Sequence, residues 1–154
     1  MNGRRSPGVA RPGRIVVERV DGAASVPLPA RATDGSACFD LRAAEAAALT
    51  YGQITLVRTG LRMRAPPGTF LEVRPRSGLS TKGVLMANAP GTIDRDYAGE
   101  VKVPLTYLFP GSYEIEVGDR IGQIRLVADR IAVFRPGTVR PMGSRRGGFG
   151  STGR

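Results

Sequence analysis

Hydrophobic residues recur along the chain in short runs, and several of these runs alternate with polar residues, as at 61–64 (LRMR) and 113–117 (YEIEV). This period, together with many β-branched residues, predicts strands rather than helices. Turn-forming sequences such as 65–68 (APPG) and 109–111 (FPG) separate the runs. The predicted strands lie at 14–20, 39–42, 53–58, 61–64, 70–74, 84–88, 101–107, 113–117 and 121–128. Many short strands at this spacing indicate an all-β sandwich or barrel.

Two segments do not follow the strand pattern. Residues 26–34 contain Pro27 and Pro29, which favour an extended edge or loop because proline has no backbone N–H to donate. Residues 43–49 (AAEAAAL) have the highest helix propensity in the chain, but they lack an N-cap and are too few for a stable helix. We therefore expect a loop or a single turn at 43–49.

The two ends of the chain differ in composition from its middle. The length of 154 residues suits one domain. Residues 1–13 are rich in Gly, Pro and Arg and have no apolar period, which predicts a disordered basic N-terminal arm. The sequence becomes rich in Gly and Arg again near its end. We therefore expect a β-rich domain at 14–139 and a C-terminal arm at 140–154.

The net charge of +10 is concentrated at these ends. Residues 1–14 carry four arginines and residues 135–154 carry five, in both cases without an acidic residue, whereas 15–134 holds 14 basic and 13 acidic residues. A nucleic-acid-binding domain more often carries its basic charge as a patch on the folded body. The distribution therefore argues against nucleic-acid binding as the main function.

Missing residue types exclude several kinds of chemistry. The chain has no histidine and one cysteine, which excludes a Ser-His-Asp triad, a Cys-His dyad and a thiolate zinc cluster. Acid–base chemistry would then depend on Asp, Glu, Tyr or metal-bound water. No stretch approaches the about 18 apolar residues of a membrane span, so we expect a cytoplasmic protein with no membrane partner.

Three polar, glycine-containing segments are candidates for a binding site. Residues 74–79 (RPRSGL) combine forked cations, a hydroxyl and a glycine, which suits a phosphate, although a solvated turn has the same composition. Within 88–97, Pro90 and Gly91 predict a hairpin whose backbone could bind the edge of a planar ligand. Asp94 in this segment is either a functional carboxylate or an acid that caps a turn. Tyr97 is either a functional aromatic residue or a half-buried strand residue.

The third candidate segment is 118–123 (GDRIGQ). Its adjacent Asp119 and Arg120 are more typical of a structural ion pair than of a catalytic one. Gln123 is either a solvated strand residue or a contact to phosphate or water.

Five segments together resemble the motifs of the homotrimeric dUTPase family, in the family's order and spacing. The resemblance covers about residues 15–153, and its third and fifth motifs are long and unusual enough to exclude chance. The five segments are 37–41 (ACFDL), 75–79 (PRSGL), 88–100 (NAPGTIDRDYAGE), 118–123 (GDRIGQ) and 147–153 (GGFGSTG).

Two positions depart from the family pattern. Cys38 stands where the family usually has glycine, and cysteine packs as a small hydrophobic residue. Ser144 stands where the family usually has an arginine, three residues before its paired glycines. Either Arg145 or Arg146 would then contact the γ-phosphate.

The resemblance implies a distorted jelly-roll-like β-barrel or sandwich with a mobile C-terminal arm. It also implies a homotrimer with active sites at subunit interfaces. The implied reaction is hydrolysis of dUTP to dUMP and pyrophosphate by water attack on the α-phosphorus. This reaction limits uracil in DNA and supplies dUMP for dTMP synthesis. No nucleic-acid partner is required.

The resemblance assigns the chemistry to residues of the first four motifs. Asp94 would contact the deoxyribose and orient or deprotonate the attacking water. Asp40 would hold metal-bound water, or help to hold Asp94 and the sugar. Mg²⁺ would be bound through substrate phosphates and waters, without direct protein ligands. The phosphate oxygens would be bound by Arg76, Ser77, Gly78 and Gln123.

Specificity would come from the segment around the predicted hairpin and from the C-terminal arm. The uracil edge would pair with Asn88 and with backbone groups around Thr92, while Tyr97 would pack on the deoxyribose and exclude a ribose 2′-hydroxyl. The arm would close over the substrate of another subunit, with Phe149 stacking on the base. The remaining substrate-binding positions are Gly91, Ile93, Lys102, Gly150 and Ser151.

Two alternatives remain at this point. A dCTP deaminase or bifunctional deaminase–dUTPase shares the fold, but those relatives lack a tail like 147–153. A non-catalytic nucleic-acid or regulatory binding protein is disfavoured because the polar residues of the catalytic motifs are intact. Mg²⁺-dependent release of pyrophosphate from dUTP would distinguish among these possibilities.

Overall fold

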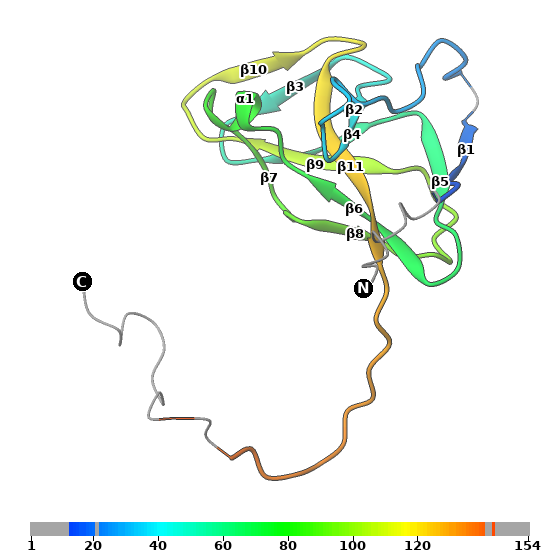
Figure 1. The fold of residues 1–154 in the computed structure, drawn as a ribbon. Helices are drawn as coiled ribbons and strands as arrows, with labels where there is room; N and C mark the ends of the chain where they lie inside the picture. Colours follow the sequence, from blue (N-terminus) through cyan, green and yellow to red (C-terminus); the bar gives the residue numbers. More distant parts are fainter. Residues whose placement is uncertain (1–12, 21, 141–142, 144–154) are drawn as a thin grey trace, which may run out of the picture.

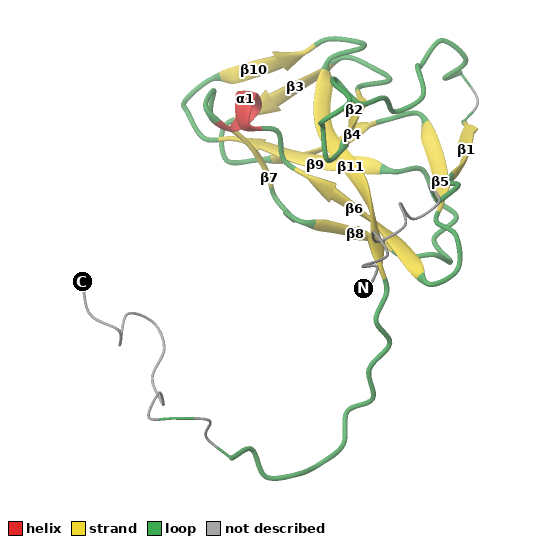
Figure 2. Ribbon diagram, viewed as in Figure 1, coloured by secondary structure: helices red, strands yellow, loops and turns green. Residues whose placement is uncertain are grey.

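The computed structural model describes residues 13–20, 22–140 and 143, and within them it is almost entirely β (Figure 2). A single helical turn, α1 (Ser77–Ser80), interrupts the strands. The strands are β1 (Val16–Arg19), β2 (Phe39–Arg42), β3 (Ala47–Thr50), β4 (Ile54–Arg58), β5 (Leu61–Arg64), β6 (Thr69–Arg74), β7 (Val84–Met86), β8 (Gly91–Ile93), β9 (Lys102–Tyr107), β10 (Ser112–Ile115) and β11 (Arg120–Ala128). The predicted all-β class is confirmed.

The strands form four antiparallel sheets that wrap into one body (Figure 1). The largest has the order β2-β11-β6-β8, and a three-stranded sheet has the order β4-β9-β7. Two-stranded ribbons, β1-β5 and β10-β3, complete the body. Because neighbouring strands are mostly distant in sequence, the topology brings the polar segments at 37–41, 75–79 and 118–123 onto one sheet.

The core fills the space between the inner faces of these sheets. Alternating positions are buried along the strands, as expected for sheets with one inner and one outer face. Leu71 and Val73 of β6 pack in the same cluster as Val103 and Leu105 of β9. Among the described residues, Thr59 is the one fully buried polar side chain, and its hydroxyl donates to the carbonyl of Val101 at 2.6 Å. Its polar group is therefore satisfied.

The predicted loop at 43–49 is wrong in its second half. Ala47 and Leu49 belong to β3, which pairs with β10. Leu49 is fully buried, and helix propensity is overridden because this pairing places it in the core. Residues 26–34 form no strand and make one isolated bridge, between Ala30 and Asp40, as expected for an extended loop.

The predicted hairpin around Pro90 and Gly91 is also wrong. The turn leads from β7 to β8, but β7 pairs with β9 and β8 pairs with β6. It therefore crosses from the three-stranded to the four-stranded sheet. The Ala89–Pro90 peptide bond in it is cis.

Strands occupy 16–128, a shorter range than the predicted domain at 14–139. Residues 129–140 form no helix or strand, are exposed throughout and lead away from the body (Figure 1). Most of the two predicted arms lies outside the described residues. Among those described, no helix is long and apolar enough to cross a membrane.

Candidate active site

Three adjacent strands place polar side chains side by side on the outer face of the largest sheet. Gln123 of β11 lies opposite Asp40 of β2 on one side and opposite Arg74 of β6 on the other. Residues directly opposite each other in an antiparallel pair point to the same face. The period of the strands therefore explains why residues from two separate motifs meet beside Arg74, the residue that precedes a third motif.

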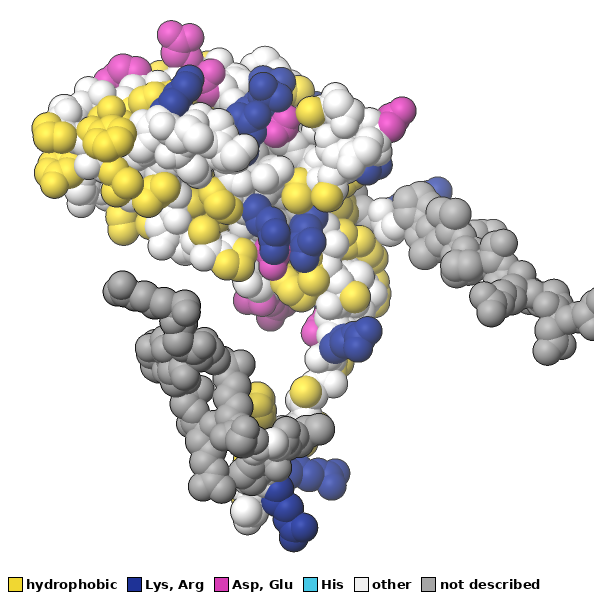
Figure 3. Space-filling model, turned by 60° about the vertical axis from the view of Figure 1, so that its left-hand side comes forward, with side chains coloured by type: hydrophobic (Ala, Val, Ile, Leu, Met, Phe, Trp, Pro, Cys, Tyr) yellow, Lys and Arg dark blue, Asp and Glu magenta, His cyan; other side chains and the backbone are white. Residues whose placement is uncertain are grey.

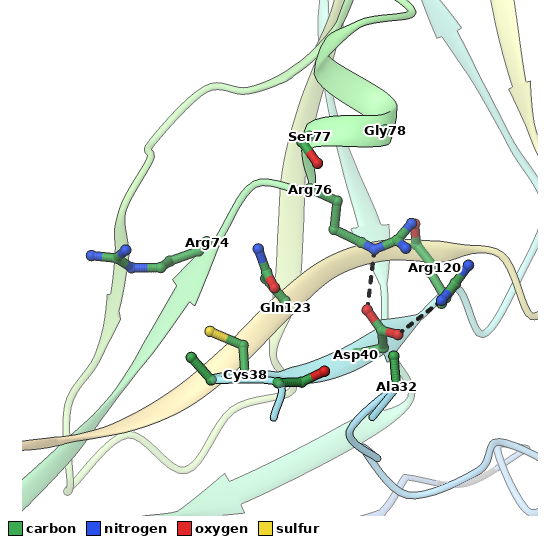
Figure 4. Close-up of a pocket in the computed structure, with 11 residues that line it drawn as sticks. Ala32, Cys38, Asp40, Arg74, Arg76, Ser77, Gly78, Arg120 and Gln123 are labelled. Atoms are coloured by element: carbon green, nitrogen blue, oxygen red, sulfur yellow. Dashed lines mark hydrogen bonds and ion pairs between the residues drawn. The ribbon is translucent and has the colours of Figure 1, made fainter. Parts of the chain in front are cut away.

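This row of side chains lies in a pocket of about 440 Å³, which Figure 4 shows from close by. The pocket is open to solvent and carries more basic than acidic side chains, which suits an anionic ligand. It is lined by Ala32, Ser36, Ala37, Cys38, Asp40, Arg74, Arg76, Ser77, Gly78, Arg120 and Gln123.

The Asp40 carboxylate joins two arginines at the centre of the pocket (Figure 4). Arg76 Nε donates to Asp40 Oδ1 at 3.1 Å, and a terminal nitrogen of Arg120 donates to Asp40 Oδ2 at 3.2 Å. The Asp40 side chain is 17% exposed, so these ion pairs are better shielded from water than ordinary surface pairs. The group keeps a net charge of +1 facing the pocket.

The turn that leads from β6 into α1 is fixed by β11. Gln123 Nε2 donates to the carbonyl of Pro75 at 2.8 Å, and a terminal nitrogen of Arg76 donates to the carbonyl of Arg120 at 3.2 Å. The residues that follow, Ser77 and Gly78, line the pocket. Both ends of the Pro75–Arg76 step are thus tied to one strand.

A second concavity brings together four of the expected substrate-binding residues. Asn88, Ile93, Tyr97 and Lys102 line it, together with Leu56, Glu100, Val101 and Pro104. The Tyr97 hydroxyl donates to the carbonyl of Glu100 at 3.0 Å. The Glu100 carboxylate accepts in turn from the backbone N–H of Gly60 at 2.8 Å and from Arg58. Tyr97 is therefore held in place while its side chain stays half exposed.

Gly99 and Gly91 allow close packing around this concavity. A Cβ at Gly99 would lie 2.5 Å from the Tyr97 hydroxyl oxygen, and one at Gly91 would lie 2.9 Å from Met86 and 3.1 Å from the Asn88 amide nitrogen. The glycines of the third motif are thus required by the positions of Tyr97 and Asn88.

Asp94 lies in a third concavity, with Thr92, Arg95, Asp96 and Asp129. Asp94 lines neither the pocket around Asp40 nor the concavity around Tyr97. One copy of the chain therefore distributes the predicted site residues over three concavities. Those of Asp94 and Tyr97 are neighbours, since the backbone N–H of Tyr97 donates to the carbonyl of Asp94 at 3.2 Å. The predicted arm residues Arg145, Arg146, Phe149, Gly150 and Ser151 lie outside the described residues.

Arg120 is the functional candidate that the sequence analysis missed. It does not pair with Asp119 as expected, because Asp119 accepts from the backbone N–H of Glu116 at 3.0 Å while Arg120 reaches across to Asp40. A period-2 pattern places Arg120 and Gln123 on opposite faces of a strand, so no local signal indicated that both would line one pocket.

A second charge cluster lies beside the pocket. Arg74 Nε donates to Glu72 Oε1 at 2.6 Å, and Arg125 Nε donates to the same oxygen at 3.1 Å. The hydrogen bond from Arg74 holds the pKa of Glu72 below its usual value, and the same bond raises the pKa of Arg74. Figure 4 shows the Arg74 side chain pointing away from Asp40, so this cluster is separate from the Asp40 group.

Comparisons with known proteins agree on one family. A model of the dUTPase family matches residues 24–153. The deoxyuridine 5'-triphosphate nucleotidohydrolase of Zymomonas mobilis subsp. mobilis is 42% identical over 142 residues, which cover 91% of this chain and 97% of that relative. The protein of the same name from Anaeromyxobacter sp. is 47% identical over 131 residues, covering 82% of this chain and 88% of the relative.

Solved structures show the same fold. The dUTPase of Staphylococcus bacteriophage 80alpha, solved with dUpNHpp, superimposes with a TM-score of 0.76 at 24% identity, covering 91% of this chain and 98% of the phage chain. The dUTPase of Streptococcus mutans gives a TM-score of 0.72 at 27% identity, covering 77% of this chain and 98% of the other.

Proposed function

The chain belongs to the dUTPase family, and on this premise we propose that it hydrolyses dUTP to dUMP and pyrophosphate by water attack on the α-phosphorus. The single observation that carries the proposal is the pocket in which Asp40, Arg76, Ser77, Gly78 and Gln123 meet. These residues come from three of the family's motifs. Their positive charge and hydrogen-bond donors are complementary to the anionic oxygens of a triphosphate.

The pocket supplies the groups that bind the phosphates. Arg76 keeps N–H groups beyond those used for Asp40 and Arg120, and these point positive charge toward an incoming anion. The Ser77 hydroxyl and the backbone at Gly78 add neutral donors. Such prearranged donors favour the transition state because negative charge grows on the phosphate oxygens as the leaving group departs.

Asp94 is proposed to orient the attacking water and to accept its proton. A carboxylate can do this when its position supplies much of the barrier reduction. Asn88, Thr92 and Ile93 would bind the uracil edge, and Tyr97 would pack on the deoxyribose. Asp40 contributes by holding the two arginines of the phosphate pocket.

The residues present fit a magnesium ion held by the substrate rather than by the protein. Within the described part of the chain, no three acidic or cysteine side chains gather closely enough to form a metal site. Mg²⁺ commonly binds through substrate phosphates and keeps several waters. When bound in this way it would neutralise charge on the triphosphate, next to the polar residues around Asp40.

We propose that the complete site forms between subunits of a homotrimer. The outer face of the β4-β9-β7 sheet is apolar, since Ile54 and Leu56 are 63% and 59% exposed and Leu85 lies in the same row. Leu56 also lines the concavity of Asn88 and Tyr97, so a partner that covers this face would close that concavity. The partner could then add its phosphate pocket to the base-binding side.

The segment 129–140, which leads into the C-terminal arm, is proposed to carry that arm to another subunit. Within the described segment 129–140, Ile131, Val133 and Phe134 are 89%, 78% and 99% exposed. Figure 3 shows that this part of the chain runs outside the body and carries basic side chains. Its apolar side chains have no cover in their own subunit, and its charge suits an anionic substrate.

Turnover of purified protein tests the proposed function. We expect Mg²⁺-dependent release of pyrophosphate from dUTP, loss of activity with a chelator, and much lower activity with UTP and dTTP. Ammonia release from dCTP is the control for the deaminase alternative. A protein that binds dUTP without releasing pyrophosphate would contradict the proposal.

A further inference from the structure

Strand β11 contains an irregularity next to the phosphate pocket. Arg120 lies opposite Arg42 of β2, but the next pair along is Gly122 with Leu41, so Ile121 is an extra residue. Such a β-bulge shifts the strand's alternation by one position. Ile121 and Gly122 are consequently both buried, although adjacent residues of a regular strand point to opposite faces.

The bulge changes which face Arg120 occupies. Three positions separate Arg120 from Gln123, which in a regular strand puts their side chains on opposite faces. With the extra residue both side chains line the same pocket. The bulge therefore delivers Arg120 to the Asp40 carboxylate.

We propose that Arg120 is a positioning residue for the reaction, acting through Asp40 on the guanidinium of Arg76. This inference rests on the proposed function of the pocket. Arg120 contributes twice, because its side chain occupies Asp40 Oδ2 and its backbone carbonyl accepts from Arg76 at 3.2 Å. Asp40 Oδ1 remains for Arg76 Nε. The Arg76 plane is thus fixed by two acceptors, and Arg120 sets the place of both.

Arg120 and Arg76 differ in the number of donor nitrogens that their contacts use. Arg76 donates from two different nitrogens to two acceptors, which requires the planar fork of a guanidinium. Arg120 makes one end-on bond to Asp40 Oδ2, which a single ammonium can replace. Lysine should therefore substitute for Arg120 but not for Arg76.

A double-mutant cycle tests whether Arg120 acts through Asp40. We expect Arg120→Gln to lower kcat/KM for dUTP about 10- to 100-fold, the usual range for losing a hydrogen bond to a charged group. In the Asp40→Asn background the same change should cost less than about threefold, since the partner is already gone. Affinity for dUpNHpp, measured by calorimetry, should follow the same pattern. Arg120→Lys should retain most of the activity, whereas Arg76→Lys should not.

Arg42→Gln is the matched control. Arg42 lies opposite Arg120 on β2 and loses the same charge, but its side chain donates to the carbonyl of Gly118 rather than to Asp40. We expect this variant to keep kcat/KM and dUpNHpp affinity within about threefold of the parent, and its coupling to Asp40→Asn to be absent.

Three outcomes would overturn the positioning role. They are full additivity of Arg120→Gln with Asp40→Asn, an equal loss in Arg42→Gln, and no rescue by lysine in a protein with an unchanged unfolding temperature. If Arg120→Gln does not fold, the kcat/KM and dUpNHpp affinity of Arg120→Lys, compared with those of Arg76→Lys, decide alone. An inactive parent that still binds dUpNHpp would contradict the proposed function, while the binding cycle would still test Arg120.

Discussion

Asp94 belongs to the segment after β8, on a different surface from the Asp40 pocket of its own chain. We expect Asp94→Asn to lower kcat by about 10²–10⁴, because the amide has nearly the same shape but cannot accept a proton from water. Affinity for dUpNHpp should stay within a few-fold of the parent. Asp96→Asn removes the same charge from the same concavity and serves as control. Rapid turnover by Asp94→Asn would exclude this residue as the base.

Tyr97 makes a second prediction at the scale of single residues. Tyr97→Ala should reduce the preference for dUTP over UTP, because the aromatic ring no longer excludes a 2′-hydroxyl. Tyr97→Phe keeps the ring and loses only the hydrogen bond to the Glu100 carbonyl, so it should keep the preference. The ratio of kcat/KM for the two nucleotides is the measurement. An unchanged ratio in Tyr97→Ala would remove Tyr97 from sugar discrimination.

Single residues of the site were predictable to different degrees. Asp40 and Gln123 belong to recognisable motifs, and the strand period explains why their side chains point to the same face of the sheet. Arg120 was not predictable as a partner of Asp40, because a bulge depends on how two strands distant in sequence align. The separation of Asp94 from Asp40 was equally hidden, since the motifs give order along the chain and not position in space.

At the scale of strands, local propensity predicts the wrong secondary structure where pairing with another strand determines the conformation. The segment AAEAAAL favours a helix, yet its second half is a strand because β10 is available to pair with it and the core accepts Leu49. Most other strands were predicted within a few residues, since their alternation reflects one buried and one exposed face. The turn at Pro90 was located correctly, but which strands its neighbours join depends on the whole fold.

The cluster of Glu72, Arg74 and Arg125 on β6 and β11 predicts a pH dependence. Arg74 and Arg125 both donate to Glu72, and the bond from Arg74 holds the pKa of Glu72 below its ordinary 4.5. A lowered pKa in the folded state contributes stability that is present above 4.5 and is lost as pH falls through the lower folded value. We therefore expect Glu72→Gln to unfold at a lower temperature than the parent at neutral pH, with the difference disappearing in stronger acid.

Thermal unfolding of both proteins across the acid range is the measurement. Glu18→Gln is the control, because its 3.4 Å ion pair with Arg62 between β1 and β5 is exposed on both sides and should contribute little. A difference between the parent and Glu72→Gln that persists undiminished in strong acid would contradict the proposed role of the carboxylate.

At the scale of the whole molecule, the arm can be tested by mixing subunits. Deleting 144–154 should leave the unfolding temperature nearly unchanged, because these residues are mostly Gly, Ser and Arg, and should lower kcat strongly. In the proposed homotrimer, assemblies mixed from the truncated chain and full-length Asp94→Asn should regain activity, because an intact arm can then cover an intact Asp94. Inactive trimers shown to have exchanged subunits would mean that each arm closes its own subunit's site.

The exposed apolar side chains of 129–140 also bear on how the protein withstands dilution. Ile131, Val133 and Phe134 gain nothing from the folding of one subunit, so any free energy from covering them belongs to assembly. Mass action then links stability to concentration. The unfolding temperature should rise as the protein is concentrated. Phe134→Ser should reduce this rise, while it should change the stability of a single folded subunit little.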